Sequence, residues 1–207
     1  MKNIKNIILD LGGVLINLDY NKVNTKLSEL GLSNSFSKAK QIDLIDKLEE
    51  GKISERGFID EFNRIAKTNH TKDIIIDAWN SILLDFPYER LELLELLGKK
   101  YRLFLFSNTN SIHIKKVYKI LDESYNIKNL DSYFERIYLS NELGIRKPKP
   151  EGFEYILKEN NLSPYNTLFI DDSPQHITGA KKTGIQCEWL NLEKENLHES
   201  LTRLSLI

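Results

Sequence analysis

Residues 6–13 read Asn6-Ile7-Ile8-Leu9-Asp10-Leu11-Gly12-Gly13. This stretch begins as an unbroken apolar, β-branched run, stops at a carboxylate and passes into two glycines. That order is typical of a buried strand that ends in a tight loop. Unbroken apolar runs, rather than alternating ones, indicate a parallel sheet that helices cover on both faces.

Similar runs recur along the chain and supply the other strands of that sheet. They lie at 103–106, 137–139, 167–170 and 186–190. Apolar residues between these runs repeat at helical spacing. This spacing predicts helices at 89–100, 110–121, about 150–158 and 174–183. Strands that alternate with helices of this length form βαβ units, so the sequence predicts a doubly wound α/β fold.

One long segment, from about residue 21 to 86, shows helical periodicity and no strand pattern. It carries four apolar rows at helical spacing, which Gly31, Gly51 and a polar stretch at 68–71 separate. The segment therefore predicts an α-helical insert between the first and second strands. We expect an α/β core of residues 1–15 and 88–207 and an α-helical cap of residues 16–87.

The composition excludes several classes of protein. The chain has 29 Lys and Arg against 30 Asp and Glu, so its net charge of -1 gives no general attraction to nucleic acid or anionic membranes. The single cysteine, Cys187, excludes an internal disulfide framework and a cysteine-cluster zinc site. The apolar runs are too short for a signal peptide or a membrane span. We expect a cytoplasmic protein, and no pattern indicates its oligomeric state.

Four polar motifs follow predicted strands, at the edge where open α/β sheets bind ligands. The first is Asp10 with its glycines, and the second is Ser107-Asn108-Thr109-Asn110. An Asp followed by glycines presents its carboxylate and leaves backbone groups accessible. Short hydroxyl and amide groups at a helix start can hold a phosphate. Taken alone, each motif also fits a turn or a helix N-cap.

The other two motifs are charged. In Arg146-Lys147-Pro148-Lys149-Pro150 the prolines stiffen the chain, so that Lys147 can be aimed at an anion. A solvated basic turn is the alternative. Asp171 and Asp172 follow a predicted buried strand, and two adjacent carboxylates repel each other and call for a cation. This pair also fits the N-cap of a helix that begins at Pro174.

Together, the order Asp, Ser, Lys and Asp-Asp, each after an apolar run, resembles the haloacid dehalogenase superfamily of hydrolases, most of which are phosphatases. The resemblance covers nearly the whole chain and includes a helical cap inserted after the first motif. Within the superfamily, the sequence is similar to small bacterial sugar-phosphate phosphatases whose first motif reads Asp-x-Gly-Asn/Gly-Val. Residues 106–110, 146–148 and 169–172 are close to that subgroup's pattern.

The resemblance implies which residues act on the phosphate. Asp10 is expected to be the nucleophile that forms an aspartyl-phosphate. Ser107, Asn108 and Lys147 are expected to hold the phosphoryl oxygens, Ser107 by its hydroxyl and Lys147 as a point charge.

The resemblance also implies a Mg²⁺ site. Asp10, the backbone carbonyl of Gly12 and Asp172 are expected to bind the ion, with Asp171 beside them. Mg²⁺ and Lys147 would then offset the repulsion between a carboxylate nucleophile and a phosphate dianion.

The sequence departs from the commonest pattern of the superfamily at Gly12, where most of its phosphatases carry a second Asp as general acid and base. Loss of such a group slows catalysis by about 10²–10⁴-fold. The subgroup that the chain resembles also has Gly there and consists of phosphatases. Asp19, at the entrance to the cap, is a candidate substitute. The alternative is that Asp19 caps the helix that starts near Asn21.

Other residues near these motifs have weaker signals. His113 and His176 follow the second and fourth motifs closely, but neither has the spacing of a metal ligand. Trp79 is expected in the core of the cap rather than stacked on a substrate. The Glu49-Glu50-Gly51-Lys52 turn of the cap can face the site, and we expect it to be solvated.

These observations predict a Mg²⁺-dependent phosphatase that hydrolyses a small phosphorylated metabolite, a sugar or sugar alcohol phosphate. A cap of this size encloses a small site, which argues against protein and nucleic-acid substrates. Two alternatives remain. One is a 2-haloacid dehalogenase-type hydrolase, which uses the same Asp nucleophile without metal. The other is a non-catalytic regulatory protein of the same fold, for which Gly12 is the only support.

Overall fold

The centre of the molecule is a parallel sheet of five strands in the order β3-β2-β1-β4-β5. The computed structural model describes residues 3–33, 36 and 41–207. The strands are β1 (Asn6–Leu9), β2 (Arg102–Ser107), β3 (Arg136–Leu139), β4 (Thr167–Asp171) and β5 (Gln186–Trp189). The chain runs outward from β1 to β3 and then crosses back to β4 on the other side of β1. This reversal of strand order beside β1 is where doubly wound folds bind ligands.

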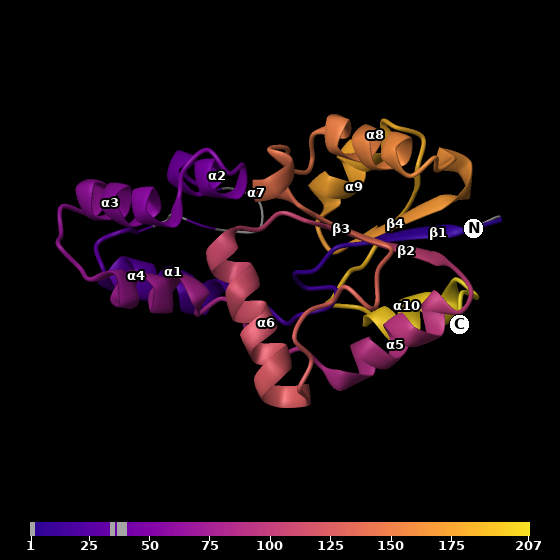
Figure 1. The fold of residues 1–207 in the computed structure, drawn as a ribbon, viewed down its shortest axis with the longest axis horizontal. Coiled ribbons are helices and arrows are strands. Elements are labelled where there is room, and N and C mark those ends of the chain that lie inside the picture. The colour runs from indigo at the N-terminus through magenta and orange to yellow at the C-terminus, as the bar shows by residue number, and fades with distance from the viewer. Residues whose placement is uncertain (1–2, 34–35, 37–40) are drawn as a thin grey trace.

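Helices cover both faces of the sheet (Figure 1). On one face lie α5 (Tyr88–Gly98), α6 (Ser111–Tyr125) and α10 (Leu197–Arg203), and on the other lie α8 (Pro150–Glu159) and α9 (Pro174–Lys181). Ile7 and Leu9 pack with the first group and Ile8 packs with the second, because successive side chains of a strand point to opposite faces. The prediction of a doubly wound α/β fold is therefore confirmed.

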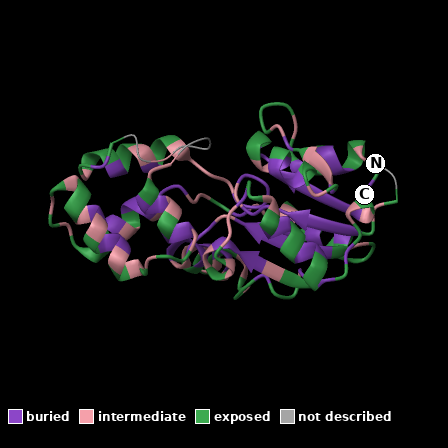
Figure 2. Cartoon of the chain, turned by 90° about the horizontal axis from the view of Figure 1, so that it is seen from above, coloured by how far each residue is buried: buried purple, intermediate pink, exposed green. Residues whose placement is uncertain are grey.

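Of the helices described between β1 and β2 in the sequence, the first four lie beyond the edge of the sheet, and α5 covers one of its faces (Figure 1). The first four are α1 (Tyr20–Glu29), α2 (Asp43–Glu49), α3 (Glu55–Ala66) and α4 (Lys72–Asn80). Their buried faces meet in a separate apolar cluster around Trp79, which is fully buried (Figure 2). One expected apolar row consists of Phe58, Phe62 and Ile65. The structure buries the first two, but Ile65 is exposed at the last turn of α3. Residues 34–35 and 37–40 of the expected insert lie outside the described residues.

Two chain segments connect these four helices to the sheet, one before α1 and one after α4. The two segments lie side by side. Leu18 and Leu83 form an antiparallel bridge, Asn17 N donates to Asp85 O at 3.0 Å, and Asp19 N donates to Ile82 O at 2.8 Å. A second contact comes from α6, where the ring of His113 stacks on Trp79 with ring centroids 4.4 Å apart. The helical insert is thus held at its base by backbone pairing and by one aromatic stack.

The helix ends explain how the polar motifs are placed. The Asn110 side chain accepts hydrogen bonds from the backbone N–H groups of Ile112 and His113, which begins α6 immediately after β2. Pro150 and Pro174 occupy the first turns of α8 and α9, where a missing N–H has no cost. Two shorter helices, α7 (Ser140–Leu143) and η1 (Pro164–Asn166), complete the fold. No helix among the described residues is long and apolar enough to cross a membrane.

Candidate active site

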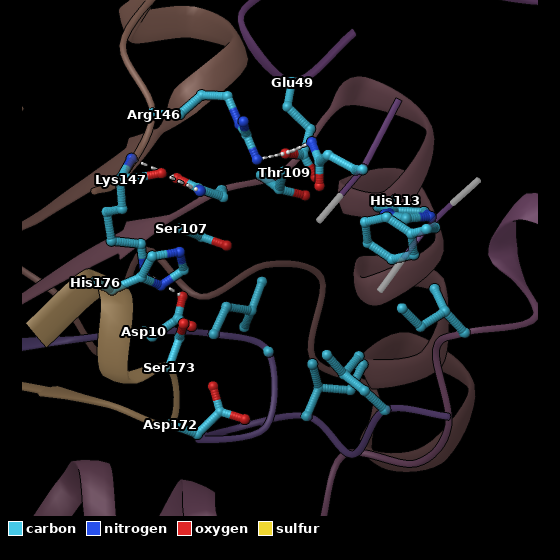
Figure 3. Close-up of a pocket in the computed structure, with 18 of the residues that line it drawn as sticks. Asp10, Glu49, Ser107, Thr109, His113, Arg146, Lys147, Asp172, Ser173 and His176 are labelled. Carbon is cyan, nitrogen blue, oxygen red and sulfur yellow. Dashed lines mark hydrogen bonds and ion pairs between the residues drawn. The ribbon is translucent and has the colours of Figure 1, made fainter. Parts of the chain in front are cut away.

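A cavity of about 430 Å³ lies at the carboxyl edge of the sheet, between the sheet and the four inserted helices (Figure 3). Its walls bring together residues from all four motifs predicted from the sequence. From the sheet side they include Asp10, Gly12, Ser107, Asn108, Lys147, Asp172 and His176, and from the insert side Tyr20, Gln41, Asp46 and Glu49. The strand ends therefore converge on one enclosed space, as their topology predicts.

Lys147 is the centre of a buried ion-pair network on the sheet side. Its side chain is fully buried, and Nζ lies 2.8 Å from Oδ1 of Asp10 and 2.6 Å from Oδ2 of Asp171. Burial alone would lower the pKa of Lys147, but the charges of Asp10 and Asp171 outweigh it and raise that pKa. The lysine is therefore a fixed positive charge at the cavity wall, and the alternative of a solvated basic turn is wrong for Lys147.

Asp10 follows β1, and its surroundings disfavour a negative charge on its carboxylate. Burial, followed by the charge of Asp171, raises the pKa of Asp10 well above its usual range, while Lys147 lowers it and Asp172 raises it further. The pKa of Asp171 lies below its usual range: burial would raise it, but Lys147 and His176 outweigh that effect. Lys147 pairs with two carboxylates, and the negative charge of Asp172 acts on Asp10 as well, so this concentration of carboxylates favours a divalent cation.

Ser107 and Asn108 lie at the end of β2 and differ in what their side chains contact. The Ser107 hydroxyl points into the cavity and has no hydrogen-bond partner among the described residues (Figure 3). The Asn108 side chain instead pairs with the backbone of Lys147: Nδ2 donates to Lys147 O at 2.9 Å, and Lys147 N donates to Oδ1 at 2.8 Å. Asn108 thereby fixes the segment that carries Lys147.

The loop after Asp10 packs directly on Asp172. Gly13 has a φ of +75°, and a Cβ at this position would overlap the Asp172 carboxylate. Only glycine combines this conformation with so close an approach. Asp172 is buried and lines the cavity. Its carboxylate therefore lies against the loop that follows Asp10, at the cavity wall.

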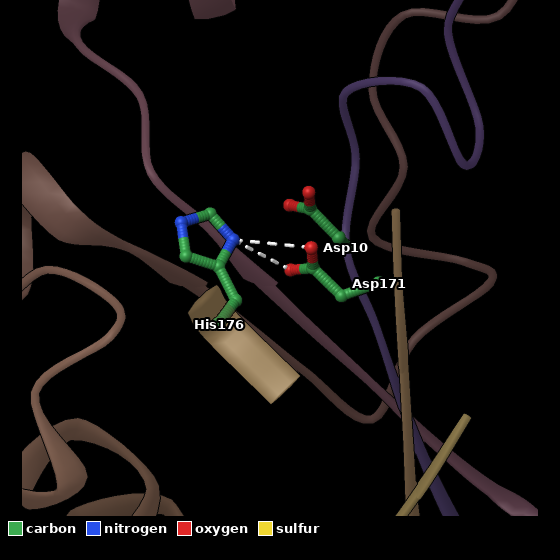
Figure 4. A group of neighbouring side chains, drawn as sticks. All are labelled: Asp10, Asp171 and His176. Carbon is green, nitrogen blue, oxygen red and sulfur yellow. Dashed lines mark hydrogen bonds and ion pairs between the residues drawn. The ribbon is translucent and has the colours of Figure 1, made fainter. Parts of the chain in front are cut away.

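A second acidic grouping lies deeper in the same region. Asp10, Asp171 and His176 offer ligand atoms within 4.8 Å of one another (Figure 4). This group differs from the expected metal ligands, because it contains Asp171 and His176 but not Asp172. The Nδ1 of His176 lies 3.0 Å from Oδ2 of Asp171, the carboxylate oxygen that also binds Lys147. The Lys147 ammonium already lies between the carboxylates of Asp10 and Asp171. It therefore takes the place that a metal ion would need in this group.

Three candidates from the sequence have structural roles. Asp19 caps α1, accepting a hydrogen bond from Lys22 N at 2.9 Å, and it does not line the cavity. Trp79 lies in the core of the inserted helices, as predicted. His113 lines the cavity, but its Nε2 lies 3.2 Å from Trp79 O, and burial lowers its pKa to about 4.

The insert side of the cavity holds polar residues that the sequence did not identify as functional. Glu49 is buried and lines the cavity, so the expectation of a solvated turn is wrong for this residue, although Lys52 is exposed. Burial raises the pKa of Glu49, and the nearby Arg146 opposes that shift. The Tyr20 side chain also lines the cavity, and burial, with the charge of Asp172, raises its pKa, so its hydroxyl stays protonated.

A model of the haloacid dehalogenase-like hydrolase family matches residues 4–184, so the chain belongs to this family. The match confirms the family expected from the four motifs. A D-ribitol-5-phosphate phosphatase from Bacteroides thetaiotaomicron is 31% identical over 186 residues, which cover 88% of this chain and 90% of that protein. A glyceraldehyde 3-phosphate phosphatase from Pyrococcus furiosus is 31% identical over 113 residues, 54% of this chain and 44% of that protein.

A solved structure extends this similarity to three dimensions. A haloacid dehalogenase family enzyme from Bacteroides thetaiotaomicron, in complex with magnesium and inorganic phosphate, superimposes with a TM-score of 0.82 at 34% identity. The superposition covers 95% of this chain and 98% of that chain.

Proposed function

We propose that this protein is a Mg²⁺-dependent phosphatase that hydrolyses a small phosphorylated metabolite, a sugar or sugar alcohol phosphate. The observation that carries the proposal is the contact between Asp10 and the buried Lys147 at 2.8 Å, with the Ser107 hydroxyl facing the same enclosed cavity. The similarity to a D-ribitol-5-phosphate phosphatase over most of both chains supports the substrate class.

We further propose that residues 1–15 and 88–207 form the catalytic core and that residues 16–87 form a cap. The separate apolar cluster of α1 to α4 and its paired connecting segments support this division. The cap closes one side of the cavity, which excludes bulk water from the reacting groups. That the protein acts in the cytoplasm stays a prediction.

In the proposed reaction, a carboxylate oxygen of Asp10 attacks phosphorus and the bond to the ester oxygen breaks, which gives an aspartyl-phosphate. Lys147 binds a phosphoryl oxygen through its ammonium, and Ser107 donates its hydroxyl to another. Asn108 holds the Lys147 backbone in place. Water then hydrolyses the intermediate, which releases phosphate and restores the Asp10 carboxylate.

The donor set at the cavity suits Mg²⁺. Asp10, Asp172 and the Gly12 carbonyl offer only oxygen atoms, the ligands that Mg²⁺ prefers. The charges of Asp171 and Asp172 both disfavour a charged Asp10, and a cation beside these carboxylates would relieve that repulsion. Mg²⁺ held there would supply Lewis-acid stabilisation of the charge that develops on the phosphoryl oxygens. Asp171 takes no part as a ligand in this proposal, because Lys147 and His176 bind its carboxylate.

The two alternatives have less support. A dehalogenase of this family needs no metal, whereas the excess of carboxylates at this site favours a dication. A purely regulatory protein does not need a buried lysine held between two carboxylates at the wall of an enclosed cavity.

The test is phosphate release from an aryl phosphate and from a panel of sugar and sugar alcohol phosphates. We expect turnover with Mg²⁺, loss with EDTA, recovery when Mg²⁺ returns, and poor recovery with Ca²⁺, which takes longer bonds and more ligands. Asp10→Asn should fold and lose at least about 10³-fold in kcat. The exposed Asp131→Asn is the matched control and should keep wild-type activity.

Metal binding is also measured without turnover. Mg²⁺ should raise the thermal unfolding midpoint of the wild type, and Asp172→Asn should remove most of this increase. Release of halide from a 2-haloacid without metal would favour the dehalogenase instead. Absence of turnover on every ester and haloacid would leave the regulatory alternative.

A further inference from the structure

Arg146, the residue before Lys147, lies where the core meets the cap at the wall of the cavity. We call this part of the wall, with Asp46 and Glu49 of α2, the cap wall. The Nη1 of Arg146 binds Oδ1 of Asp46, and its Nη2 lies 2.8 Å from Oε2 of Glu49. Figure 3 shows the Arg146–Glu49 pair across the cavity from Asp172. A guanidinium that faces a substrate pocket is the usual means of binding a second anionic group. Here both of its terminal nitrogens are already bound to carboxylates of the cap.

The described residues of this wall carry a net negative charge once Arg146 is counted. Asp46 and Glu49 carry two negative charges against the one positive charge of Arg146. Among the described residues, the nearby Lys149 and Lys52 do not change this balance, because both bind Glu50, which does not line the cavity. Glu49 is 5% exposed, so water does little to screen its charge. A carboxylate or a second phosphate would meet repulsion here.

The same wall has unused groups that suit hydroxyls. Gln41 Nε2 and Arg146 both contact Oε2 of Glu49, so Oε1 has no hydrogen-bond partner among the described residues. The Nε of Arg146 is buried and likewise lacks a partner. Tyr20 adds a protonated hydroxyl with no partner in the described part of the chain. A hydroxyl group both donates and accepts, so it can satisfy acceptors and donors of this kind together.

The cap turn is also packed too tightly to release Arg146 easily. Gly51 has a φ of +67°, and a Cβ at this position would overlap the backbone oxygen of Asn141 in α7. This close approach keeps the C-terminal end of α2 against the segment that carries Arg146. The ion pairs are therefore part of the closed structure, and breaking them leaves buried charges without partners.

We infer that Asp46 and Glu49 mask Arg146 and thereby restrict the enzyme to phosphate esters whose remainder is uncharged and hydroxylated, while excluding esters that carry a second anionic group. This inference rests on the proposed phosphatase function and specifies its substrate class. Asp46 and Glu49 are specificity-determining residues in this scheme, and the reacting groups remain at Asp10 and Lys147.

The test compares two esters that differ at one position: a pentitol 5-phosphate and the pentonic acid 5-phosphate of the same configuration, in which a carboxylate replaces the terminal CH₂OH. We expect the wild-type kcat/KM to be at least about 100-fold lower for the acid. We call the ratio of these two kcat/KM values the gap. Glu49→Gln should narrow this gap at least about tenfold, chiefly through a lower KM for the acid, because Arg146 gains a free nitrogen. Asp46→Asn should narrow it in the same direction.

Glu50→Gln is the matched control and should keep the wild-type gap, because Glu50 binds Lys149 outside the cavity. Circular dichroism checks folding, and Asp46→Asn decides the outcome if Glu49→Gln does not fold. A wild-type gap below about threefold, or an unchanged gap in both cap variants, would overturn the inference while leaving the phosphatase intact. No phosphate release from either ester or from an aryl phosphate would instead reject the proposed function itself.

Discussion

The side chain of Leu18 fills the space next to Gly12: its Cδ1 lies 2.8 Å from the position that a Cβ on Gly12 would take. Leu18 also packs against the apolar clusters of both the core and the inserted helices. An Asp at position 12 therefore cannot be added without moving a leucine that joins these two clusters. The glycine in the first motif and the leucine six residues later are complementary.

We expect Gly12→Asp to destabilise the protein by about 1 kcal/mol, the low end of the cost of overpacking, because the atom that must move is the end of a leucine side chain at the cavity wall. In a Leu18→Ala background the same substitution should cost clearly less, because the space is already open. Urea unfolding of the four proteins gives this comparison as a double-mutant cycle. An equal cost in both backgrounds would show that Leu18 is not the obstacle.

The absence of an acid at position 12 has a kinetic consequence, and Asp19 does not repair it. Its carboxylate caps α1 and lies outside the cavity walls. Rates of aspartyl-phosphate formation should therefore depend steeply on the pKa of the leaving alcohol, because no side chain at position 12 protonates it. The measurement is kcat/KM across a series of aryl and sugar phosphates. Asp19→Asn should leave both the slope and the rates unchanged, since Asn is an equally good N-cap. A flat slope in the wild type that becomes steep in Asp19→Asn would make Asp19 the acid.

Lys147 should matter for both stability and activity. Lys147→Met keeps the length of the side chain but leaves Asp10 and Asp171 buried without their cation, which should cost about 3–5 kcal/mol of unfolding free energy. It should also reduce kcat/KM at least about 30-fold through the lost phosphate contact. Lys149→Met is the control, because Lys149 is largely exposed, and we expect a change within about 0.5 kcal/mol. A loss of activity below about threefold in Lys147→Met would place the phosphate elsewhere.

His113 should make the stability of the protein depend on pH. Its pKa in the folded protein, about 4, lies below the ordinary value of 6.5. The folded state therefore binds this proton less readily than the unfolded state, so its stabilising contribution is complete above pH 6.5 and is lost as the pH falls toward 4. The full loss amounts to about 3 kcal/mol.

His113→Phe should remove this part of the pH dependence. Unfolding free energies at pH 7.5 and pH 5 should differ less in this variant than in the wild type. His198→Phe is the control, since His198 is exposed and its substitution should keep the wild-type difference. An unchanged difference in His113→Phe would mean that His113 titrates normally.

The sheet and its motifs could be predicted because their signals are local. Strands β1, β2 and β4 contain unbroken apolar runs, and a polar motif stands at the end of each, as Asp10 follows β1. The motif of Lys147 lies further from its strand, because α7 separates it from β3. The short helix α7 has only four residues, which is too short to give an apolar row. Ile65 matched a helical row with Phe58 and Phe62, but it is exposed and does not belong to the cluster around Trp79.

The cap wall of the cavity could not be predicted because its contacts join distant parts of the chain. Arg146 meets Asp46 across 100 residues of sequence, and nothing in the α2 segment distinguishes Glu49 from an ordinary surface glutamate. The role of Asn108 was equally hidden, since its side chain contacts the backbone of a residue 39 positions away. Such relationships depend on how two segments pack, which composition and periodicity do not encode.

The paired segments at the base of the cap limit the ways in which a substrate can enter. The antiparallel bridge between Leu18 and Leu83 joins the two connecting segments into one short two-stranded ribbon. Backbone hydrogen bonds at Asn17 and Asp19 hold this ribbon together. Twisting the cap against the core would shear those bonds, whereas bending across the face of the ribbon would preserve them. A motion that admits a substrate should therefore bend the ribbon rather than twist it. Such a motion must also break the ion pairs that join Arg146 to Asp46 and Glu49.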